Sequence, residues 1–440
     1  MLLLPSKLMR NGEAGVISMY KRKILLAILI AVTLILGSCS EYFSLYSGGE
    51  DLMSAVKGST WPDAPDKIDS DFQKTLFDFS WIFFREVSQN EGNVLISPAS
   101  VYLALGMTYN GADTETCKAM AKTLKTEGLS EEEFNTACRD YISILESLGE
   151  KTELAIANSV WYRRGFNPDK DFLRKNADYF RATAQALDFD DPKSAKIIND
   201  WVNKQTKGTI DKIVDKIQPD VVMYLINAVY FKSDWQVPFD AANTREMQFH
   251  TPKGDVVAKF MNRSGHMQYI DKNGVKGVIL PYDDGRFSFF ALLPKEGKDV
   301  RAFIKELDGK EIRNYLLSKE EGYISLSLPK FETSFEDSLK DELTKLGMGI
   351  AFDSSKADFS RMNAEREKNL YISEILHKTY CKVDELGTEA SAVTSIEVTL
   401  TSMPVGQDIH IVFDRPFVYG IVDTTTEAPL FLGIMENPTQ

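Results

Sequence analysis

The segment from Glu385 to Leu400, E-L-G-T-E-A-S-A-V-T-S-I-E-V-T-L, offers the main-chain chemistry of a β-strand that can be added to a sheet. Counted in steps of two from Thr388, one set of side chains is uncharged and begins with small residues: Thr388, Ala390, Ala392, Thr394, Ile396, Val398 and Leu400. The other set includes Glu389 and Ser391. Because strand side chains alternate between two faces, the uncharged set can be buried. The pattern predicts a strand with one buried face; an ordinary exposed-face strand is the alternative.

Glycine and proline set the limits of this segment. Gly387 precedes it and can act as a hinge, since glycine adopts unusual dihedral angles without steric cost. Between Thr388 and Met403 there is no proline or glycine, and β-branched residues are frequent. Pro404 ends the stretch. The whole segment can therefore become extended once it is released.

Histidine is the side chain most often used as a catalytic base, and the chain has four: His250, His266, His377 and His410. None belongs to an H-E-x-x-H motif, and the sequence also lacks G-x-S-x-G and a P-loop. His377 lies in an alternating, strand-like stretch, which favours a buried, hydrogen-bonded residue. The other three are expected at the surface or at edges. We expect no enzyme.

Cysteines are few. Apart from Cys39 near the N-terminus, the chain has Cys117, Cys138 and Cys381, an odd number, so at least one of them is unpaired. A bridge between Cys117 and Cys138 stays open, and buried free cysteine is the default. No C-x-x-C motif is present, which disfavours a zinc site. We expect neither a metal nor a cofactor.

Composition indicates a globular protein, with 43% hydrophobic and 26% charged residues. No interior linker or repeat follows residue 70, so one domain over 67–440 is expected, large enough to bury a core without disulfides. The formal net charge is −13, and it becomes −17 without the first 38 residues, which hold five basic residues and one acidic residue. This acidity argues against nucleic acid as a partner.

The N-terminal residues have the order of an export signal. A basic cluster, Lys21–Lys23, precedes the apolar run Ile24–Leu36, which is short for a membrane span. The following L-G-S-C resembles a bacterial lipobox, which implies cleavage of residues 1–38 and lipidation of Cys39, a membrane anchor. A plain secretory signal cut near residue 38 and an uncleaved anchor are the alternatives. Residues 39–66 are expected to form a flexible tether.

Periodicity predicts a mixed α+β chain, with helices mostly early and strands mostly late. The predicted helices are Phe72–Ser88, Ser97–Asn110, Thr114–Thr123 and Ser130–Leu148, the last with a capping box of Ser130 and Glu133. The predicted strands are Leu154–Tyr162, Val221–Phe231, Gly277–Pro281, Phe287–Leu293, Tyr323–Leu328, Ile409–Phe413, Phe417–Asp423 and Leu430–Met435.

A set of short motifs, in order along Asp71–Pro438, closely resembles the serpin family. The motifs are N-V-L-I-S-P-A-S (Asn93–Ser100), L-A-L-G-M-T-Y-N-G-A (Leu103–Ala112), A-N-S-V-W-Y (Ala157–Tyr162), I-N-D-W-V-N-K-Q-T-K-G-T-I (Ile198–Ile210), L-I-N-A-V-Y-F-K-S-D-W (Leu225–Trp235), L-P-K-F-E (Leu328–Glu332), L-G-M (Leu346–Met348), A-D-F-S (Ala357–Ser360), H-K-T (His377–Thr379) and F-D-R-P-F (Phe413–Phe417). The E-L-G-T-E-A-S-A hinge departs from the family pattern at Leu386 and Ser391, and neither change adds bulk to the uncharged set.

The resemblance implies the serpin fold: three β-sheets, eight to nine helices and an exposed reactive-centre loop. It implies a hinge formed by Glu385, Gly387, Thr388, Glu389, Ala390, Ser391 and Ala392. It implies a shutter, the group of residues that controls opening of the central sheet, formed by Asn93, Ser97, Pro98, Ser100, Asn227 and His377. Trp235 and Glu385 would lie at the breach, where an inserting strand first enters.

The resemblance also implies a function, irreversible suicide inhibition of serine, or cysteine, endopeptidases by a monomer that forms a covalent complex with its target. The family's spacing from Glu385 places the reactive bond at Thr401–Ser402, with Leu400 and Met403 as neighbours. A small uncharged residue after leucine suits elastase-like or subtilisin-like proteases, and papain-like ones. A non-inhibitory serpin that acts as a binding protein is the alternative. With lipid on Cys39, the protein is expected at the bacterial outer membrane, in the periplasm or exposed at the surface.

Overall fold

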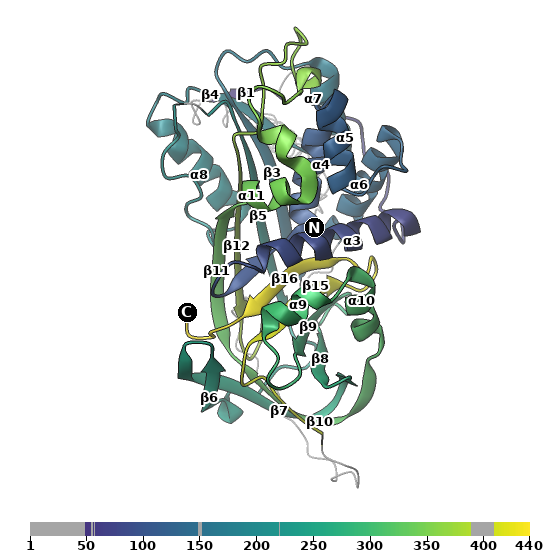
Figure 1. Ribbon diagram of the computed structural model, residues 1–440, viewed down its shortest axis with the longest axis vertical. Helices are drawn as coiled ribbons and strands as arrows, with labels where there is room; N and C mark the ends of the chain where they lie inside the picture. The colour runs from purple at the N-terminus through teal and green to yellow at the C-terminus, as the bar shows by residue number, and fades with distance from the viewer. Residues whose placement is uncertain (1–48, 54–55, 57, 148–151, 220, 389–408) are drawn as a thin grey trace, which may run out of the picture. The chain divides into compact units, whose positions relative to one another are not determined.

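The computed structural model describes residues 49–53, 56, 58–147, 152–219, 221–388 and 409–440. Asp51–Gln440 forms a compact unit, and the architecture below is that of this unit (Figure 1). The predicted signal peptide, Cys39, the hinge residues from Glu389 to Ala392 and the predicted reactive bond with its neighbours lie outside the described residues. Among the described helices, none is both long enough and apolar enough to cross a membrane.

The α-helices are concentrated in the first half of the unit, as predicted. They are α3 (Ser70–Val87), α4 (Pro98–Tyr109), α5 (Thr114–Thr123), α6 (Glu131–Glu146), α7 (Lys170–Phe180), α8 (Lys193–Gln205), α9 (Val300–Glu306), α10 (Gly309–Leu317) and α11 (Lys340–Leu343). The capping box predicted for α6 is present, since Ser130 and Glu133 satisfy each other's main-chain N–H groups. In α3, Phe72, Leu76 and Phe79 form one buried face, as the sequence pattern indicates.

The first sheet is built around two strands of 12 residues each, Thr152–Arg163 and Met223–Asp234. In order across the sheet, six of its strands are β4 (Thr183–Leu187), β3 (Thr152–Arg163), β5 (Met223–Asp234), β13 (Gly387–Thr388), β12 (Glu374–Val383) and β11 (Phe331–Ser338). Strands β5 and β12 are parallel and pair directly over Tyr224–Ala228 and Glu374–Lys378. Beyond these pairs the two strands separate, and β13 lies between them at the far end, antiparallel to both.

The second sheet includes most of the late strands. Its path is β14 (Ile409–Val412), β10 (Glu320–Pro329), β7 (Gly254–Lys272), β8 (Val275–Pro281), β9 (Phe287–Leu293), β15 (Phe417–Asp423), β16 (Pro429–Met435) and β2 (Val94–Ile96), with β6 (Arg245–Thr251) on β7. β7 pairs with β6 and β10 over its first part and with β8 over its last. The strands β6, β10 and β14 at this end of the sheet correspond to the third sheet that the resemblance implies.

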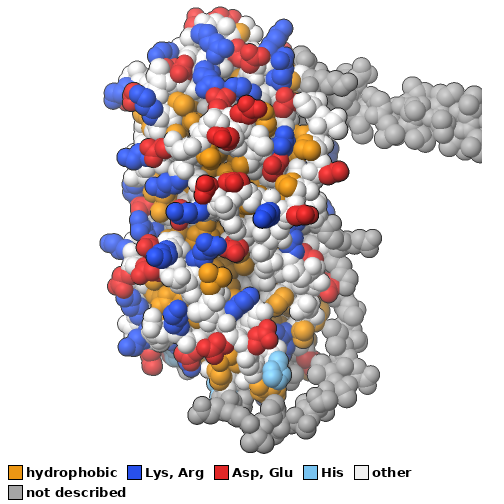
Figure 2. Space-filling view, turned by 90° about the vertical axis from the view of Figure 1, so that its right-hand side faces the viewer, with side chains coloured by type: hydrophobic (Ala, Val, Ile, Leu, Met, Phe, Trp, Pro, Cys, Tyr) orange, Lys and Arg blue, Asp and Glu red, His pale blue; other side chains and the backbone are white. Residues whose placement is uncertain are grey.

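Two apolar clusters hold the layers together. The larger one fills the space between the sheets and includes α4, which is buried on all sides and packs on β3, β5 and β16. The smaller one joins α8 to the outer face of β3 and β5 through Trp161, Ile198 and Trp201. On the face of the molecule shown in Figure 2, basic and acidic side chains are interspersed, with hydrophobic side chains in small patches between them.

The segment before α3 differs from the expected flexible tether. Its described part lies against the domain: the Leu52 N–H donates to Ala184 of β4 at 3.1 Å, and the guanidinium of Arg181 lies 4.1 Å from the ring centroid of Trp61. The apolar Leu52 and Trp61 explain the difference, since they bury surface that a tether would leave in water. The compact unit therefore begins at Asp51 rather than near residue 67.

Candidate functional site: the hinge, breach and shutter of the first sheet

β13 is a two-residue strand between β5 and β12. Gly387 is opposite Asp234, and Thr388 is opposite both Ser233 of β5 and Val383 of β12. A Cβ atom at Gly387 would lie 2.2 Å from the carbonyl oxygen of Ser233, so only glycine fits this approach. The side chain of Thr388 is buried, which is the face that the alternating pattern predicted for it.

The aromatic residues at the breach anchor the hinge. The indole Nε1 of Trp235 donates to the carbonyl oxygen of Asp384 at 2.8 Å, and its ring stacks on Tyr282, 4.8 Å between centroids. The hydroxyl of Tyr282 is hydrogen-bonded to that of Thr388 at 2.5 Å. Sequence reasoning identified Trp235 but missed Tyr282, because the contact joins residues 106 positions apart without a local signal.

Glu385 is held by groups from two other elements. Its carboxylate accepts from Lys330 Nζ at 2.7 Å and from the hydroxyl of Thr244 at 2.8 Å. Burial raises the pKa of this carboxyl, but these hydrogen bonds outweigh burial and lower the pKa overall. Main-chain N–H groups of Trp235 and Phe239 donate to Leu386 and Glu385. The segment Trp235–Phe239 therefore fixes the start of the hinge.

The shutter is a buried hydrogen-bond network around His377. Its Nε2 accepts from the main-chain N–H of Ser97 at 3.1 Å, so the proton of the neutral ring is on Nδ1, which donates to Asn227 Oδ1 at 2.9 Å. The amide of Asn227 donates to Ser100 Oγ and to Asn158 Oδ1. Burial lowers the pKa of His377 to about 3. His377 is therefore a neutral structural residue, as the sequence indicated.

The structure brings most of the predicted shutter residues together but leaves out Asn93. Pro98 is the first residue of α4, directly after Ser97. The Asn93 side chain instead accepts from the N–H groups of Glu436 and Asn437, so it fixes the end of the chain. Asn93 lies apart from the network around His377, because β2 pairs with β16 and directs this side chain to the segment after β16.

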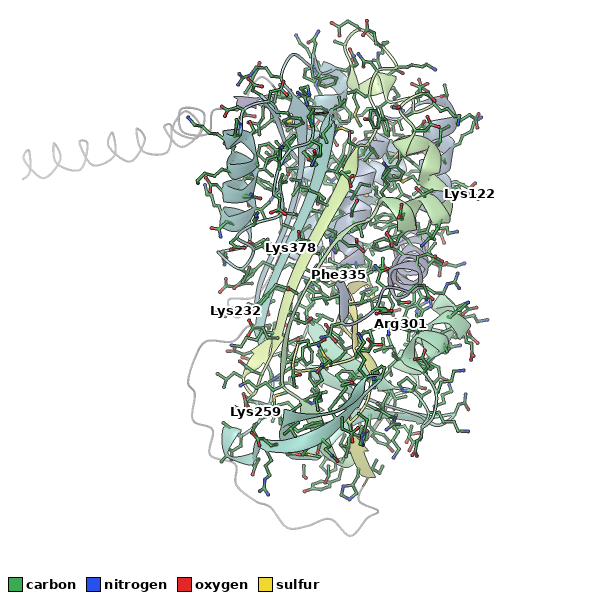
Figure 3. All side chains as sticks on the ribbon, turned by 60° about the vertical axis from the view of Figure 1, so that its left-hand side comes forward. Lys122, Lys232, Lys259, Arg301, Phe335 and Lys378 are labelled. Carbon is green, nitrogen blue, oxygen red and sulfur yellow. The ribbon has the colours of Figure 1, made fainter. Side chains whose placement is uncertain are left out.

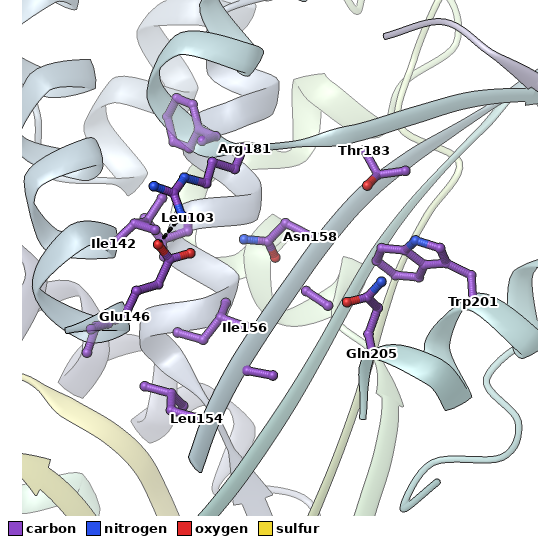
Figure 4. A pocket seen from close by; sticks show the side chains of 14 residues that line it. Leu103, Ile142, Glu146, Leu154, Ile156, Asn158, Arg181, Thr183, Trp201 and Gln205 are labelled. Carbon is purple, nitrogen blue, oxygen red and sulfur yellow. Dashed lines mark hydrogen bonds and ion pairs between the residues drawn. The ribbon is translucent and has the colours of Figure 1, made fainter. Parts of the chain in front are cut away.

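Two further residues belong to the network. Thr379 of β12 donates to the carbonyl oxygen of Leu95 at 2.7 Å, and Asn158 joins β3 to Asn227. Asn158 also lines a cavity of about 280 Å³ behind β3, between α6, α7 and α8 (Figure 4). At one side of this cavity Glu146 and Arg181 form an ion pair. Asn158 and Thr379 lie in two of the motifs that carry the resemblance, A-N-S-V-W-Y and H-K-T, but the sequence analysis did not single them out as site residues.

The remaining candidate residues have no catalytic arrangement. His250, His266 and His410 are exposed, as predicted, and His250 is bonded to Asp255. None of Cys117, Cys138 and Cys381 is in a disulfide, so the possible bridge between the first two is not formed. Within the described residues, no group of three or more His, Cys, Asp or Glu side chains could hold a metal ion.

Comparison with known proteins agrees with this geometry. The family model for serpins, described as serine protease inhibitors, matches residues 74–438. An uncharacterised serpin-like protein from Thermococcus kodakarensis is 32% identical over 364 residues, covering 82% of this chain and 84% of the relative. Human alpha-1-antichymotrypsin is 30% identical over 384 residues, covering 85% and 89%.

Solved structures give the same result. The native state of tengpin, a thermophilic serpin, superposes with a TM-score of 0.83 at 38% identity, covering 88% of this chain and 99% of tengpin. The latent state of tengpin gives a TM-score of 0.73 at 39% identity, covering 84% and 98%. With the motifs, the two sheets and the β5–β13–β12 junction, these matches show that the chain belongs to the serpin family, most of whose members are protease inhibitors.

Proposed function

We propose that this serpin is an irreversible suicide-substrate inhibitor of serine endopeptidases, with cysteine endopeptidases as a further class. The observation that supports this most strongly is β13, where Gly387 and Thr388 already lie between β5 and β12. A protease attacks the reactive bond and forms an acyl-enzyme. The freed segment then enters the first sheet as a new strand, and the protease is distorted before deacylation.

The register of β13 defines where the inserted residues would lie. Continued along both neighbours, it places Ala390 between Phe231 and Cys381, and Ala392 between Val229 and Thr379. These four neighbouring side chains are buried. The small, uncharged residues of the segment therefore fall on the face that has little room, which matches the alternation in the sequence.

The same register places Glu389 on the opposite face, between Lys232 of β5 and Lys382 of β12. Figure 3 shows Lys232 and Lys378 on the side of the sheet that comes forward in this view. A glutamate between two lysines on neighbouring strands is a favourable cross-strand arrangement. Both faces of the entering strand thus have matching neighbours at its first residues.

Insertion must also open the part of the sheet where β5 and β12 pair directly with each other. Five pairs of residues join β5 directly to β12, and one of them is Asn227 with His377. Continued register places Thr394 between these two residues, so their hydrogen bond must break. The ladder bonds that the new strand forms with both neighbours compensate for this loss. The shutter is therefore the barrier that the inserting strand must pass.

The target class is proposed from the reactive loop. Thr401, preceded by Leu400, suits elastase-like and subtilisin-like proteases, and no Lys or Arg lies between Gly387 and Pro404 for a trypsin-like enzyme. We also propose that Cys39 is lipidated and anchors the protein to a bacterial membrane. Metabolic labelling with a palmitate analogue, compared with Cys39→Ala, tests this second proposal.

Incubation with pancreatic elastase and with subtilisin tests the inhibitory function. The expected result is a complex that survives a denaturing gel, with a released peptide that begins at Ser402 by mass spectrometry. Ala392→Arg should give cleavage without complex, because a buried charge opposes insertion. Cleavage of the natural sequence without any complex, and without a rise in thermal stability, would leave the alternative of a non-inhibitory binding protein.

A further inference from the structure

A second cavity, of about 200 Å³, lies beside the segment that anchors the hinge. Its walls come from Trp235–Val237, from β7 and β8, and from Glu321 of β10. Its apolar lining includes Met267, Ile279 and Leu280. Because the volume is below the usual range for drug-sized ligands, a suitable occupant is a small molecule with a short apolar body.

Arg263 of β7 places a positive charge in this cavity. Its guanidinium donates to the carbonyl oxygen of Val237, and its Cζ lies 4.9 Å from the ring centroid of Phe239. No described carboxylate forms an ion pair with it. Burial lowers the pKa of Arg263 to about 10, so it remains a cation at neutral pH. A partly buried cation without a counter-ion favours an anionic ligand.

The other polar residues of the lining do not add further donors beside Arg263. Gln236 and His266 are exposed to solvent, and strand alternation places His266 and Gln268 on the face of β7 opposite Arg263. The one acidic residue of the lining, Glu321, is exposed at the rim. The cavity therefore offers one cation together with the apolar side chains of Met267 and Leu280, which suits a carboxylate on a hydrocarbon body.

The cavity wall is directly connected to the hinge. The N–H of Gln236 donates to the carbonyl oxygen of Pro281 at 3.0 Å, which joins the segment to β8. On its other side, the N–H groups of Trp235 and Phe239 donate to the carbonyl oxygens of Leu386 and Glu385, both at 2.8 Å. An occupant that holds the segment against β8 would also stiffen the anchor of Glu385–Thr388, from which the inserted strand continues.

We propose that this cavity binds a small carboxylate with a short apolar body, through Arg263, and that the bound carboxylate slows insertion of the strand that continues from the hinge. The carboxylate pairs with the guanidinium, and the hydrocarbon contacts Met267 and Leu280. The binding part stands on the cavity alone, whereas the regulatory part rests on the proposed inhibitory function. Such a site makes the inhibitor responsive to small organic acids in its surroundings.

Calorimetric titration with hexanoate, with 1-hexanol as the neutral probe, tests the binding. We expect hexanoate to bind, hexanol to bind much more weakly, and Arg263→Gln to weaken hexanoate binding by about 10- to 100-fold, the range for a charge-assisted hydrogen-bond pair. Arg174→Gln, a change at an exposed arginine of α7, is the matched control and should bind like the natural protein. Equal binding of acid and alcohol, no binding of hexanoate, or no effect of Arg263→Gln would overturn the proposal.

The regulatory part has a separate readout, the rate of gel-stable complex formation with elastase or subtilisin. Saturating hexanoate should slow it in the natural protein and not in Arg263→Gln. An unchanged rate despite measured binding would refute the regulatory part of the proposal, while the binding part would remain supported. If no protease forms a complex while hexanoate still binds, the proposed inhibitory function is refuted, but the proposed binding site remains supported. Circular dichroism of Arg263→Gln checks its fold, and the acid–alcohol comparison on the natural protein does not depend on that variant.

Discussion

Lowering the pH should destabilise the native state through His377. The ring is buried and neutral, accepting from Ser97 and donating to Asn227, and its pKa falls from the ordinary 6.5 to about 3. In the unfolded chain the ring binds a proton near pH 6.5, whereas in the native state it does not until about pH 3. The unfolded state thus binds more protons in this window, so stability is greatest above pH 6.5 and is lost as the pH falls toward 3.

The size of the effect follows from the two pKa values. Between pH 7 and pH 5, the difference in proton binding by His377 between the unfolded and native states integrates to about 1.4 pH units. This integral corresponds to about 2 kcal/mol of lost stability. Urea unfolding of the natural protein and of His377→Gln at both pH values measures this loss as the difference between their pH dependences. Contributions of the exposed histidines cancel in that difference.

A direct titration of the histidine ring signals by NMR gives an independent check. Four histidines are present, and the His377→Gln spectrum assigns the signal in question. The His377 signal should remain that of a neutral ring down to at least pH 5. A titration midpoint near 6.5, or identical pH dependence of the two proteins in urea, would refute the account of the shutter as a buried neutral network.

Three substitutions test the hinge. Gly387→Ala places a methyl group 2.2 Å from a carbonyl oxygen of β5, so it should displace β13 and lower the melting temperature by several degrees, measured by scanning calorimetry; an unchanged value would contradict the close approach. Ala392→Glu should shift the products with elastase from complex to cleaved inhibitor on a gel; undiminished complex would exclude burial of this face. Lys382→Glu should lower the complex fraction by about 2- to 5-fold through repulsion of Glu389, whereas Lys122→Glu, an exposed control of equal charge change (Figure 3), should not.

Local signals in the sequence predicted much of the fold. The strands Phe287–Leu293 and Phe417–Asp423 and the helix Thr114–Thr123 have the predicted bounds, because uninterrupted apolar runs or clear caps define them. The face of Thr388 also followed from alternation alone. In contrast, β7 was not predicted, since Gly265 and its neighbouring polar residues interrupt the strand pattern, and pairing with β6, β8 and β10 forms the strand instead.

Part of the site was predictable, either because a residue type in its local pattern indicates burial or flexibility, or because a motif resembles that of the family. A histidine in an alternating strand indicated a buried shutter residue, and a glycine before an extended segment indicated a hinge. Tyr282, Lys330 and Asn158 were not singled out, because their roles come from contacts with residues far away in the sequence. Asn93 shows the opposite case, since the motif placed it near the shutter while the pairing of β2 with β16 directs it to the chain end.

The structure of the protein after cleavage of its reactive loop tests the central claim most directly. We predict a new strand between β5 and β12, with Ala390 paired to Phe231 and Cys381, and with Thr394 between Asn227 and His377. A cleaved protein in which β5 and β12 keep their direct pairs over Tyr224–Ala228 and Glu374–Lys378 would contradict the mechanism.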